Sequence, residues 1–459
     1  MTLKDCAAVI LAAGQGTRMK SALHKVLHPI GGHPMLFHLL DRLAEGGVSR
    51  QVLVLGAGRE QVGNAVSGRG LEIAVQEPQL GTGHAVMAAL PRLSGPETGI
   101  FVLYADTPLI PLAVLEQMVA ALGSDGPGGP PAIVVLGFRP RDPGHYGRLI
   151  TDADGALSHI VEYRDATAAE RAVDLCNSGV MLFEAALLPD LLASLDNRNA
   201  KGEYYLTDCI AAARGKGRRV AVIEAQEDDV LGVNSRADLA AAEAVFQTRR
   251  RAEAMEAGVT LIAPETVFFS HDTEIAADVT IEPHVVFGPG VRVASGAVIR
   301  AFSHIEGADV GAGAVIGPYA RLRPGTVIGN GARVGNFVEI KKARLGEKAK
   351  ANHLAYIGDA EIGAGVNIGA GTITCNYDGF GKFRTEIGAG AFIGSNSSLV
   401  APVRIGEGAI IGAGSVIVED VESDALAIAR AGQKMRIGWA KAFRSHRKAM
   451  TKKKPERND

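Results

Sequence analysis

An aliphatic or aromatic residue recurs at every sixth position between residues 275 and 417, and this period constrains the fold more than any other feature. The count begins at Ile275 and Ile281, slips by one residue at Val310 and ends at Ile417. A lone helix or a hairpin sheet has no six-residue period, whereas a parallel β-helix forms one short strand and one corner in each hexad. Disordered Gly/Ala-rich segments would not keep their aliphatic residues in phase over so many repeats.

The hexads predict a triangular solenoid. Three hexads close one coil, and stacked coils bury a continuous column of inward-pointing side chains. Glycine and other small residues, such as Gly329, often follow the inward residue, where the chain turns a corner. The period breaks at 341–356 and 374–386, and we interpret these breaks as loops, which often lie on the binding face of such arrays.

The first half of the chain has a different pattern, in which strand-like and helix-like segments alternate. A buried strand is expected at 6–13, further strands at 52–55, 72–76, 100–104 and 132–138, and helices at 84–90 and 111–122. This alternation predicts a doubly wound, Rossmann-like α/β domain. Its ligand is expected at the carboxyl ends of the strands.

A long helix is predicted between the two halves. Ser235 is a suitable N-cap, Asp238 lies in the first turn, and Gly258 suits the C-terminal stop. We therefore expect an α/β domain at 1–236, a linker helix at 237–257, and a β-helix domain with a C-terminal tail at 258–459.

Composition excludes several classes of protein. A chain of 459 residues exceeds a single core, and its formal net charge of −2 gives no nucleic-acid footprint. Four scattered cysteines predict reduced thiols with no disulfide framework or metal site. The sequence has no apolar run long enough to insert into a membrane and no signal peptide, so a cytoplasmic protein is expected. The basic tail that starts at Lys441 is interpreted as a solvated terminus.

The first predicted strand runs into a glycine loop with nearby cations. Gly14-Gln-Gly16-Thr-Arg18 and the following Lys25 combine free backbone N–H groups with positive charge, which suits a phosphate ligand. The third glycine of a dinucleotide fingerprint is absent, and so is a Walker A motif.

This loop, continued by the segment Lys25–Gly32, resembles the sugar-nucleotide pyrophosphorylases, and the hexads resemble the left-handed β-helix acyltransferases. Together the chain resembles the bacterial bifunctional N-acetylglucosamine-1-phosphate uridyltransferases and glucosamine-1-phosphate acetyltransferases. The resemblance implies a homotrimer that acetylates glucosamine-1-phosphate with acetyl-CoA. It also implies a second reaction, in which UTP and the acetylated product give UDP-N-acetylglucosamine, a precursor of peptidoglycan and lipopolysaccharide, and pyrophosphate.

For uridyltransfer, the resemblance implies that Arg18 and Lys25 are catalytic and that Asp106 and Asn234 bind Mg²⁺, which accepts such hard oxygen ligands. His24 and Ala105 depart from the residues common in that family, Pro and Gly respectively. The residues implied to bind the nucleotide and sugar are Leu11, Ala12, Ala13, Gly14, Lys25, Gln76, Gly81, Thr82, Tyr104, Ala105, Asp106, Gly147, Glu162, Asn177 and Asn234.

For acetyltransfer, the resemblance implies His353 as the base, which suits a reaction that needs a neutral amine near neutral pH. The glucosamine-1-phosphate contacts would be Arg323, Lys341, Tyr356 and Asn367. The acetyl-CoA contacts would be Ala370, Asn376, Tyr377, Ser395, Ala413 and Arg430.

Two alternatives compete with the bifunctional enzyme. One is a single-activity sugar-1-phosphate nucleotidyltransferase whose β-helix only oligomerises, and His353, Lys341 and the Asn376-Tyr377 pair argue against it. The other is a non-catalytic scaffold or sugar-nucleotide sensor, against which Arg18 and Asp106 argue.

Overall fold

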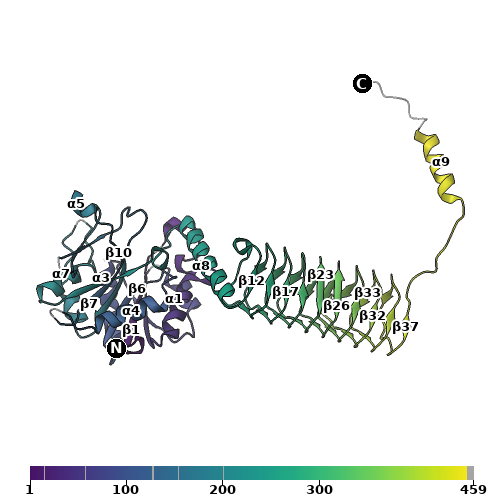
Figure 1. The fold of residues 1–459 in the computed structure, drawn as a ribbon, viewed down its shortest axis with the longest axis horizontal. Coiled ribbons are helices and arrows are strands. Elements are labelled where there is room, and N and C mark those ends of the chain that lie inside the picture. The colour runs from purple at the N-terminus through teal and green to yellow at the C-terminus, as the bar shows by residue number, and fades with distance from the viewer. Residues whose placement is uncertain (15, 57, 127–128, 153–154, 200, 452–459) are drawn as a thin grey trace, which may run out of the picture. The chain divides into compact units, whose positions relative to one another are not determined.

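The computed structural model describes residues 1–14, 16–56, 58–126, 129–152, 155–199 and 201–451. The chain folds into two compact units (Figure 1). The first comprises Met1–Ala257, Pro264–Thr273 and Phe287–Pro289, and the second comprises Gly258–Ala263, Glu274–Val286 and Gly290–Asp459. Two short segments that follow the long helix in sequence therefore pack with the first unit.

A mixed sheet forms the centre of the first unit, with the strand order β11-β7-β10-β6-β1-β4-β5. All neighbours on this path are parallel except β10, which runs antiparallel to β6 and β7. The fully buried β1 reads Cys-Ala-Ala-Val-Ile-Leu-Ala, as expected for a strand covered on both faces. The strands are β1 Cys6–Ala12, β4 Arg50–Leu55, β5 Glu72–Val75, β6 Gly99–Tyr104, β7 Ile133–Phe138, β10 Cys176–Glu184 and β11 Val220–Ala225.

Helices cover both faces of this sheet, which confirms the doubly wound prediction. On one face, α1 (Met35–Glu45) and α4 (Leu112–Leu122) bury leucine-rich stripes against the sheet. On the other face, α3 (Thr82–Ala89), α6 (Leu188–Ala193) and α7 (Asp208–Gly215) bury apolar side chains in a second core. The connections between β-strands and helices bring several loops together at the carboxyl ends of the parallel strands.

The predicted long helix is α8 (Arg236–Glu256). Ser235 caps it as expected, since its side chain accepts a hydrogen bond from the backbone N–H of Asp238 at 3.2 Å, and the Asp238 carboxylate accepts in return from Ser235. Phe246 of α8 is buried in a cluster with Ile30 and Met35. The helix is thus part of the packing of the first unit.

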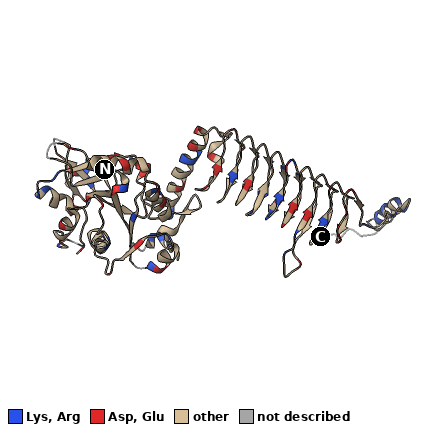
Figure 2. Cartoon of the chain, turned by 90° about the horizontal axis from the view of Figure 1, so that it is seen from below, with Lys and Arg blue, Asp and Glu red and all other residues tan. Residues whose placement is uncertain are grey.

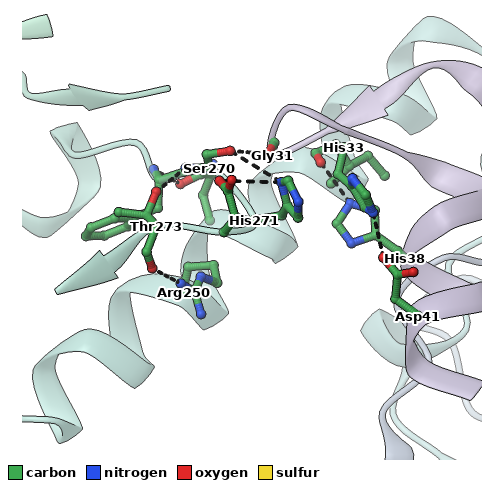
Figure 3. A network of polar contacts seen from close by, with 12 residues as sticks. Gly31, His33, His38, Asp41, Arg250, Ser270, His271 and Thr273 are labelled. Atoms are coloured by element: carbon green, nitrogen blue, oxygen red, sulfur yellow. Dashed lines mark hydrogen bonds and ion pairs between the residues drawn. The ribbon is translucent and has the colours of Figure 1, made fainter. Parts of the chain in front are cut away.

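A histidine cluster joins the β2–β3 hairpin (Pro29–Ile30 and His33–Pro34) to the segment 264–273 of the same unit (Figure 3). The rings of His33 and His271 stack with centroids 3.9 Å apart. The ring of His38, from α1, lies edge-on to His33 at 5.1 Å, and its Nε2 is 2.8 Å from the carbonyl oxygen of Ile30.

The second unit is a left-handed parallel β-helix built from short strands in three sheets. The first sheet includes β14 Thr280–Ile281, β17 Val298–Ile299, β20 Val315–Ile316, β23 Arg333–Asn336, β26 Lys350–His353 and β29 Asn367–Ile368. The second includes β18 His304–Ile305, β21 Arg321–Leu322, β24 Glu339–Lys341, β27 Tyr356–Gly358 and β30 Ile373–Cys375. The third includes β16 Arg292–Val293, β19 Ala308–Val310, β22 Thr326–Ile328, β25 Arg344–Leu345, β28 Ala360–Ile362, β31 Thr385–Ile387 and β34 Val403–Ile405.

One of the two predicted loops is wrong. Residues 341–356 do not leave the β-helix, because β25 and β26 continue its coils and bury Leu345 and Ala351. The hexad count missed these strands for two reasons. Ala351 is not a large aliphatic residue, and the inward residues Ile340 and Leu345 are five residues apart rather than six. The break at 374–386 does contain a loop, which runs from residue 376 to 384 between β30 and β31.

The described chain ends in a helix, α9 (Trp439–Thr451). Among the described residues, no helix combines the length and the apolar character needed to cross a membrane.

Candidate functional sites

A pocket of about 1050 Å³ lies at the carboxyl ends of β1, β5 and β6. Twelve of the residues predicted for uridyltransfer line it, although they come from distant parts of the sequence. They are Leu11, Ala12, Ala13, Gly14, Lys25, Gln76, Gly81, Thr82, Tyr104, Asp106, Glu162 and Asn177.

The glycine loop holds Lys25 in place. Gly16 has a φ of 63°, and a Cβ there would lie 2.5 Å from the Cβ of Lys25, so only glycine fits. Lys25 opens the 3₁₀ turn η3 (Lys25–Leu27) and lines the pocket. Arg18 lies in the turn η2 (Thr17–Met19), where it is exposed and is not among the pocket-lining residues described. Gln15 lies outside the described residues.

Asp106 and Asn234 meet at Lys25 although they are far apart in sequence. The Lys25 ammonium lies 2.5 Å from a carboxylate oxygen of Asp106 and 3.2 Å from the amide oxygen of Asn234. Asp106 follows β6, and its carbonyl accepts a hydrogen bond from the N–H of Val233 at 2.8 Å, which brings the start of α8 to the end of the sheet. The Asp238 carboxylate accepts from the N–H of Asn234 at 2.9 Å and fixes that residue.

The donor set at this point suits a hard divalent cation. A carboxylate oxygen of Asp106 and the amide oxygen of Asn234 both contact the Lys25 ammonium, so the two oxygens converge on one positive charge. Mg²⁺ is usually held by one or two protein oxygens together with water and substrate phosphates, so two such ligands beside an open pocket are sufficient.

The other end of the pocket is polar but uncharged near Gln76. The buried Gln76 side chain donates to the carbonyl of Gly81 at 2.8 Å, which orders the turn before α3. Burial raises the pKa of Tyr104, and the negative charge of Asp106 raises it further, so its hydroxyl stays protonated. An amide and a neutral hydroxyl can supply directional hydrogen bonds to an uncharged base or sugar.

The predicted sugar contacts also lie together. The N–H of Asn177 donates to the carbonyl of Gly147 at 2.9 Å. Gly147 also lies beside Glu162, since a Cβ added to the glycine would be 3.5 Å from a carboxylate oxygen of Glu162. Gly147 supports these two residues from outside the pocket lining that the structure describes. Ala105 is fully buried beside Asp106 and is likewise outside that lining.

Sequence reasoning missed several charged residues of this pocket. Arg164, Arg171 and Lys201 line it, and the Arg171 guanidinium donates to the carbonyl of Tyr163 at 3.0 Å. Arg171 ends the short helix α5 (Ala168–Arg171), and Arg164 and Lys201 lie outside the helices and strands. No spacing or motif marks a binding role in these segments, so only the folded chain could reveal it.

The residues predicted for acetyltransfer fall at two different corners of the β-helix. His353 ends β26, at the corner between the first and second sheets. Its Nδ1 is 2.8 Å from the amide oxygen of Asn336, which ends the neighbouring strand β23. An amide oxygen only accepts, so Nδ1 carries the proton and Nε2 keeps a free lone pair. Asn367 lies in β29, beside β26 in the same sheet.

The predicted phosphate-binding cations lie at the end of the second sheet, near the next corner. Lys341 ends β24, and its pKa is lowered, first by a contact with Lys382 and then by the charge of that neighbour. The guanidinium of Arg323 is 2.8 Å from the Glu339 carboxylate. The two ammonium groups repel each other, which lowers the pKa of Lys341. An anion bound between them would relieve this repulsion. Lys382, in the loop 376–384, is another residue that sequence reasoning missed.

Other predicted residues surround this second corner. The Asn376 amide donates to the Asp359 carboxylate at 2.5 Å. The hydroxyl of Tyr356 packs against Gly358. A Cβ added to that glycine would lie 2.5 Å from the hydroxyl oxygen. The Tyr377 hydroxyl donates to the carbonyl of Gly379 at 2.6 Å, within the loop 376–384.

The remaining predicted acetyl-CoA contacts follow successive coils of the first sheet. The N–H of Asn396 donates to the carbonyl of Ala370 at 2.7 Å, and the N–H of Gly414 donates to that of Ser395 at 2.8 Å. The Arg430 guanidinium donates to the carbonyl of Ala413. These contacts bring Ala370, Ser395, Ala413 and Arg430 into one row along the β-helix.

Comparisons with known proteins agree with both halves of this description. Residues 8–203 match the MobA-like NTP transferase domain, and residues 307–342 and 384–419 match the bacterial transferase hexapeptide repeats. The bifunctional protein GlmU of Sphingopyxis alaskensis is 57% identical, covering 98% of both chains. The GlmU proteins of Rhodospirillum rubrum and Rhizorhabdus wittichii are 59% and 58% identical, covering 97% of this chain and 99% and 98% of theirs.

This chain belongs to the GlmU family.

Membership of the GlmU family makes the chain a bifunctional transferase of UDP-N-acetylglucosamine biosynthesis, with nucleotidyltransferase and acyltransferase activities. Its nucleotidyltransfer reaction depends on a divalent metal ion. The single-activity alternative is not favoured, since similarity to the GlmU relatives extends over nearly the full length of both the α/β domain and the β-helix.

Proposed function

We propose that the pocket of the first unit is the uridyltransfer site and that Asp106 and Asn234 hold Mg²⁺ there. The observation that carries this proposal is the convergence of Lys25, Asp106 and Asn234 beside the glycine loop. The reaction brings two anions together, because a sugar phosphate attacks the α-phosphorus of UTP. Fixed positive charge and backbone N–H groups reduce that repulsion most where charge develops.

The reaction balances without any further reactant. A phosphate oxygen of N-acetylglucosamine-1-phosphate forms a bond to the α-phosphorus, and the bond from that phosphorus to the bridging oxygen of pyrophosphate breaks. Bound Mg²⁺ would supply charge neutralisation of the phosphates. Lys25, which is only 11% exposed, would turn from the oxygens of Asp106 and Asn234 to the phosphates of UTP.

The rest of the pocket would orient the two substrates. Gln76, Gly81 and Thr82 are assigned to the uracil. Glu162 and Asn177 are assigned to the sugar, with Gly147 supporting them. Arg18 would reach the triphosphate from η2, where its exposed side chain is available for an incoming anion.

In the β-helix, we propose that Nε2 of His353 removes the proton from the amine of glucosamine-1-phosphate. The amine nitrogen then forms a bond to the thioester carbon of acetyl-CoA, and the carbon–sulfur bond breaks to release the thiol. Asn336 holds the imidazole in the tautomer that leaves Nε2 free. Arg323, Lys341 and Lys382 would bind the phosphate of the substrate. Tyr356 and Asn367 would contact the sugar, and Asn376, Tyr377, Ala370, Ser395, Ala413 and Arg430 would contact acetyl-CoA.

We further propose a homotrimer in which this site is completed by a second copy. The base and the phosphate-binding cations lie at different corners of one β-helix, so one chain alone does not bring them together in the described contacts. The corner that carries His353 also presents a row of exposed rings on successive coils, which we call the aromatic ladder. It consists of His284, Phe302, Tyr319, Phe337 and, at its end, the apolar Leu354.

The third sheet has the opposite character, which indicates that it faces water. Acidic and basic residues both occur along the strands of the β-helix (Figure 2), and in the third sheet they form ion pairs between neighbouring strands. Arg292 pairs with Glu274 and Asp309, and Arg344 pairs with Glu361, all exposed. Solvated ion pairs contribute little to an interface, whereas exposed rings gain from burial. The aromatic ladder is therefore the better candidate for contact between copies.

The function is tested by assaying both half-reactions on one preparation of the full chain. Pyrophosphate release from UTP and N-acetylglucosamine-1-phosphate should require Mg²⁺ and stop with a chelator, while thiol release from acetyl-CoA and glucosamine-1-phosphate should continue. Acetyltransfer without uridyltransfer would contradict the first-unit site, and the reverse result would support the single-activity alternative. We expect the enzyme to be cytoplasmic.

A further inference from the structure

The C-terminal helix α9 is strongly amphipathic. Trp439, Phe443 and Met450 are spaced by four and seven residues and therefore lie on one narrow stripe of the helix. The rings of Trp439 and Phe443 stack with centroids 5.1 Å apart. These three side chains are 55%, 48% and 57% exposed, so the stripe is open to solvent.

The opposite face of α9 is basic. Lys441, Arg444 and Lys448 are spaced by three and four residues, so they form a second stripe about half a turn away. Residues 434–459 contain ten Lys or Arg and two Asp or Glu, whereas the whole chain has a formal net charge of −2. These residues thus have an excess of basic over acidic side chains, whereas the rest of the chain has an excess of acidic ones.

The fold of the chain does not use this apolar stripe. Every residue from 428 to 450 is exposed, and the segment before α9 adds the apolar side chains of Met435 and Ile437, which are 75% and 95% exposed. A 13-residue helix is marginal alone in water, so an apolar stripe of this kind gains most from a surface that covers it.

We propose that α9 binds an anionic phospholipid surface, with its axis along the membrane plane and its aromatic stripe at the boundary of the acyl chains. Helices of this kind carry Trp and Phe on one face and Lys and Arg on the other. Each basic residue near an anionic leaflet makes the free energy of binding more favourable. Long basic side chains place their charged ends among the headgroups while their methylene groups lie along the apolar surface.

Other partners fit less of the helix. A nucleic acid would match the charge and leave Trp439, Phe443 and Met450 in water. A membrane-spanning role is excluded by length, since 13 residues reach about 20 Å against a hydrocarbon core of roughly 30 Å.

Trp439 provides the test, because it is the only tryptophan in the sequence. We expect the emission of the full-length native oligomer to shift to the blue and to become protected from acrylamide on adding phosphatidylglycerol–phosphatidylcholine vesicles. Pure phosphatidylcholine vesicles should have little effect, and about 0.5 M salt should reverse most of the binding. No shift with anionic vesicles, or an equal shift with both kinds, overturns the proposal.

Variants distinguish binding by the two faces from non-specific adhesion. Phe443→Glu, and separately Lys441→Glu with Lys448→Glu, should each weaken vesicle binding by at least about tenfold. Ser445→Ala, on the same helix, serves as the matched control and should bind as the parent does. Uridyltransfer should be unchanged in all of them, which verifies that they fold. Equal vesicle binding by the parent and Phe443→Glu would overturn the proposal.

Two further outcomes would also overturn it. If Trp439 is already shielded from acrylamide before vesicles are added, then a protein surface covers the stripe. If acetyl-CoA or transfer RNA produces the blue shift and anionic vesicles do not, then the helix serves a soluble anion.

Discussion

The ammonium of Lys25 lies 2.5 Å from a carboxylate oxygen of Asp106, with the two side chains only 11% and 19% exposed. In this arrangement the lysine neutralises Asp106 and is itself held at the edge of the pocket of the first unit. Replacing that ammonium by a divalent cation would free Lys25 for an anionic substrate. If Asp106 holds the metal as proposed, it controls both the metal and the position of the lysine.

Asp106→Ala should reduce uridyltransfer by at least about 100-fold, because it removes the proposed metal ligand and the partner that positions Lys25. Asn234→Ala should have a milder effect and should mainly raise the Mg²⁺ concentration needed for half-maximal rate, by roughly tenfold or more. Pyrophosphate release measured over a Mg²⁺ titration distinguishes the two.

Acetyltransfer by the same preparations is the internal control and should be unchanged. Asp125→Ala, at an exposed loop position, controls for the loss of a carboxylate. Near-parental uridyltransfer by Asp106→Ala would mean that Asp106 is only a turn residue.

His353→Asn should lower acetyltransfer by about 10²–10⁴-fold, because an amide cannot accept the proton that the amine must lose. The measurement is thiol release from acetyl-CoA, with binding of acetyl-CoA followed separately and expected to change little. His353 is exposed at the end of β26, so folding and oligomer mass should survive the change.

His304→Asn is a matched control, since His304 is also exposed on a strand of the β-helix, β18. Its acetyltransfer should equal that of the parent. Unchanged acetyltransfer by His353→Asn would assign the proton to another group or to water. Loss of both enzymatic activities in that variant would indicate a structural histidine instead.

Much of the fold could be predicted because its two patterns are periodic. The inward position of each hexad and the alternation of buried strands with helices depend on local spacing, and both predictions are confirmed. The continuation of the β-helix through 341–356 could not be predicted from large aliphatics, because Ala351 takes an inward position. A small inward residue is invisible to a count of Val, Ile, Leu and Phe.

The candidate uridyltransfer site was predictable only where it follows a strand in sequence or matches a family motif. Gly14 and Asp106 each follow a buried strand, but Arg171 enters the pocket from a four-residue helix and Lys201 from an irregular segment, and no motif marks either. The pairing of Asp106 with Lys25 depends on an 81-residue separation that only the parallel sheet closes. Likewise, the placement of His353 and Lys341 at different corners depends on the count of residues in each coil.

Phe302→Glu combined with Phe337→Glu should dissociate the oligomer, because two charges would interrupt the stacked rings of the aromatic ladder. Light scattering should then give a mass close to that of one chain, 47.8 kDa. Acetyltransfer should be lost together with the oligomer, while uridyltransfer should persist. Arg404→Glu, on the charged third sheet, should leave the mass unchanged. An intact oligomer in the double variant would move the interface to another face.

The histidine cluster gives a prediction about stability and pH. Burial lowers the pKa of His38 to about 4, and neighbouring His33 and His271 lower it further, against the opposing effects of the hydrogen bond to Ile30 and the charge of Asp41. Burial also lowers the pKa of His271. The unfolded chain therefore binds protons at a higher pH than the folded chain does, so acid favours unfolding.

This contribution to stability is fully present above pH of about 6.5, the pKa of an unperturbed histidine, and is lost progressively as the pH falls toward 4. At pH 5 the loss from His38 amounts to about 2 kcal/mol. His38→Gln should keep a donor for the carbonyl of Ile30 but remove the titration, so the melting temperature of the first unit should fall less between pH 7 and 5. Thermal unfolding followed by helical circular dichroism measures this, with the exposed His304→Gln as the control. Equal pH dependence in His38→Gln and the parent would show that other groups cause the acid sensitivity.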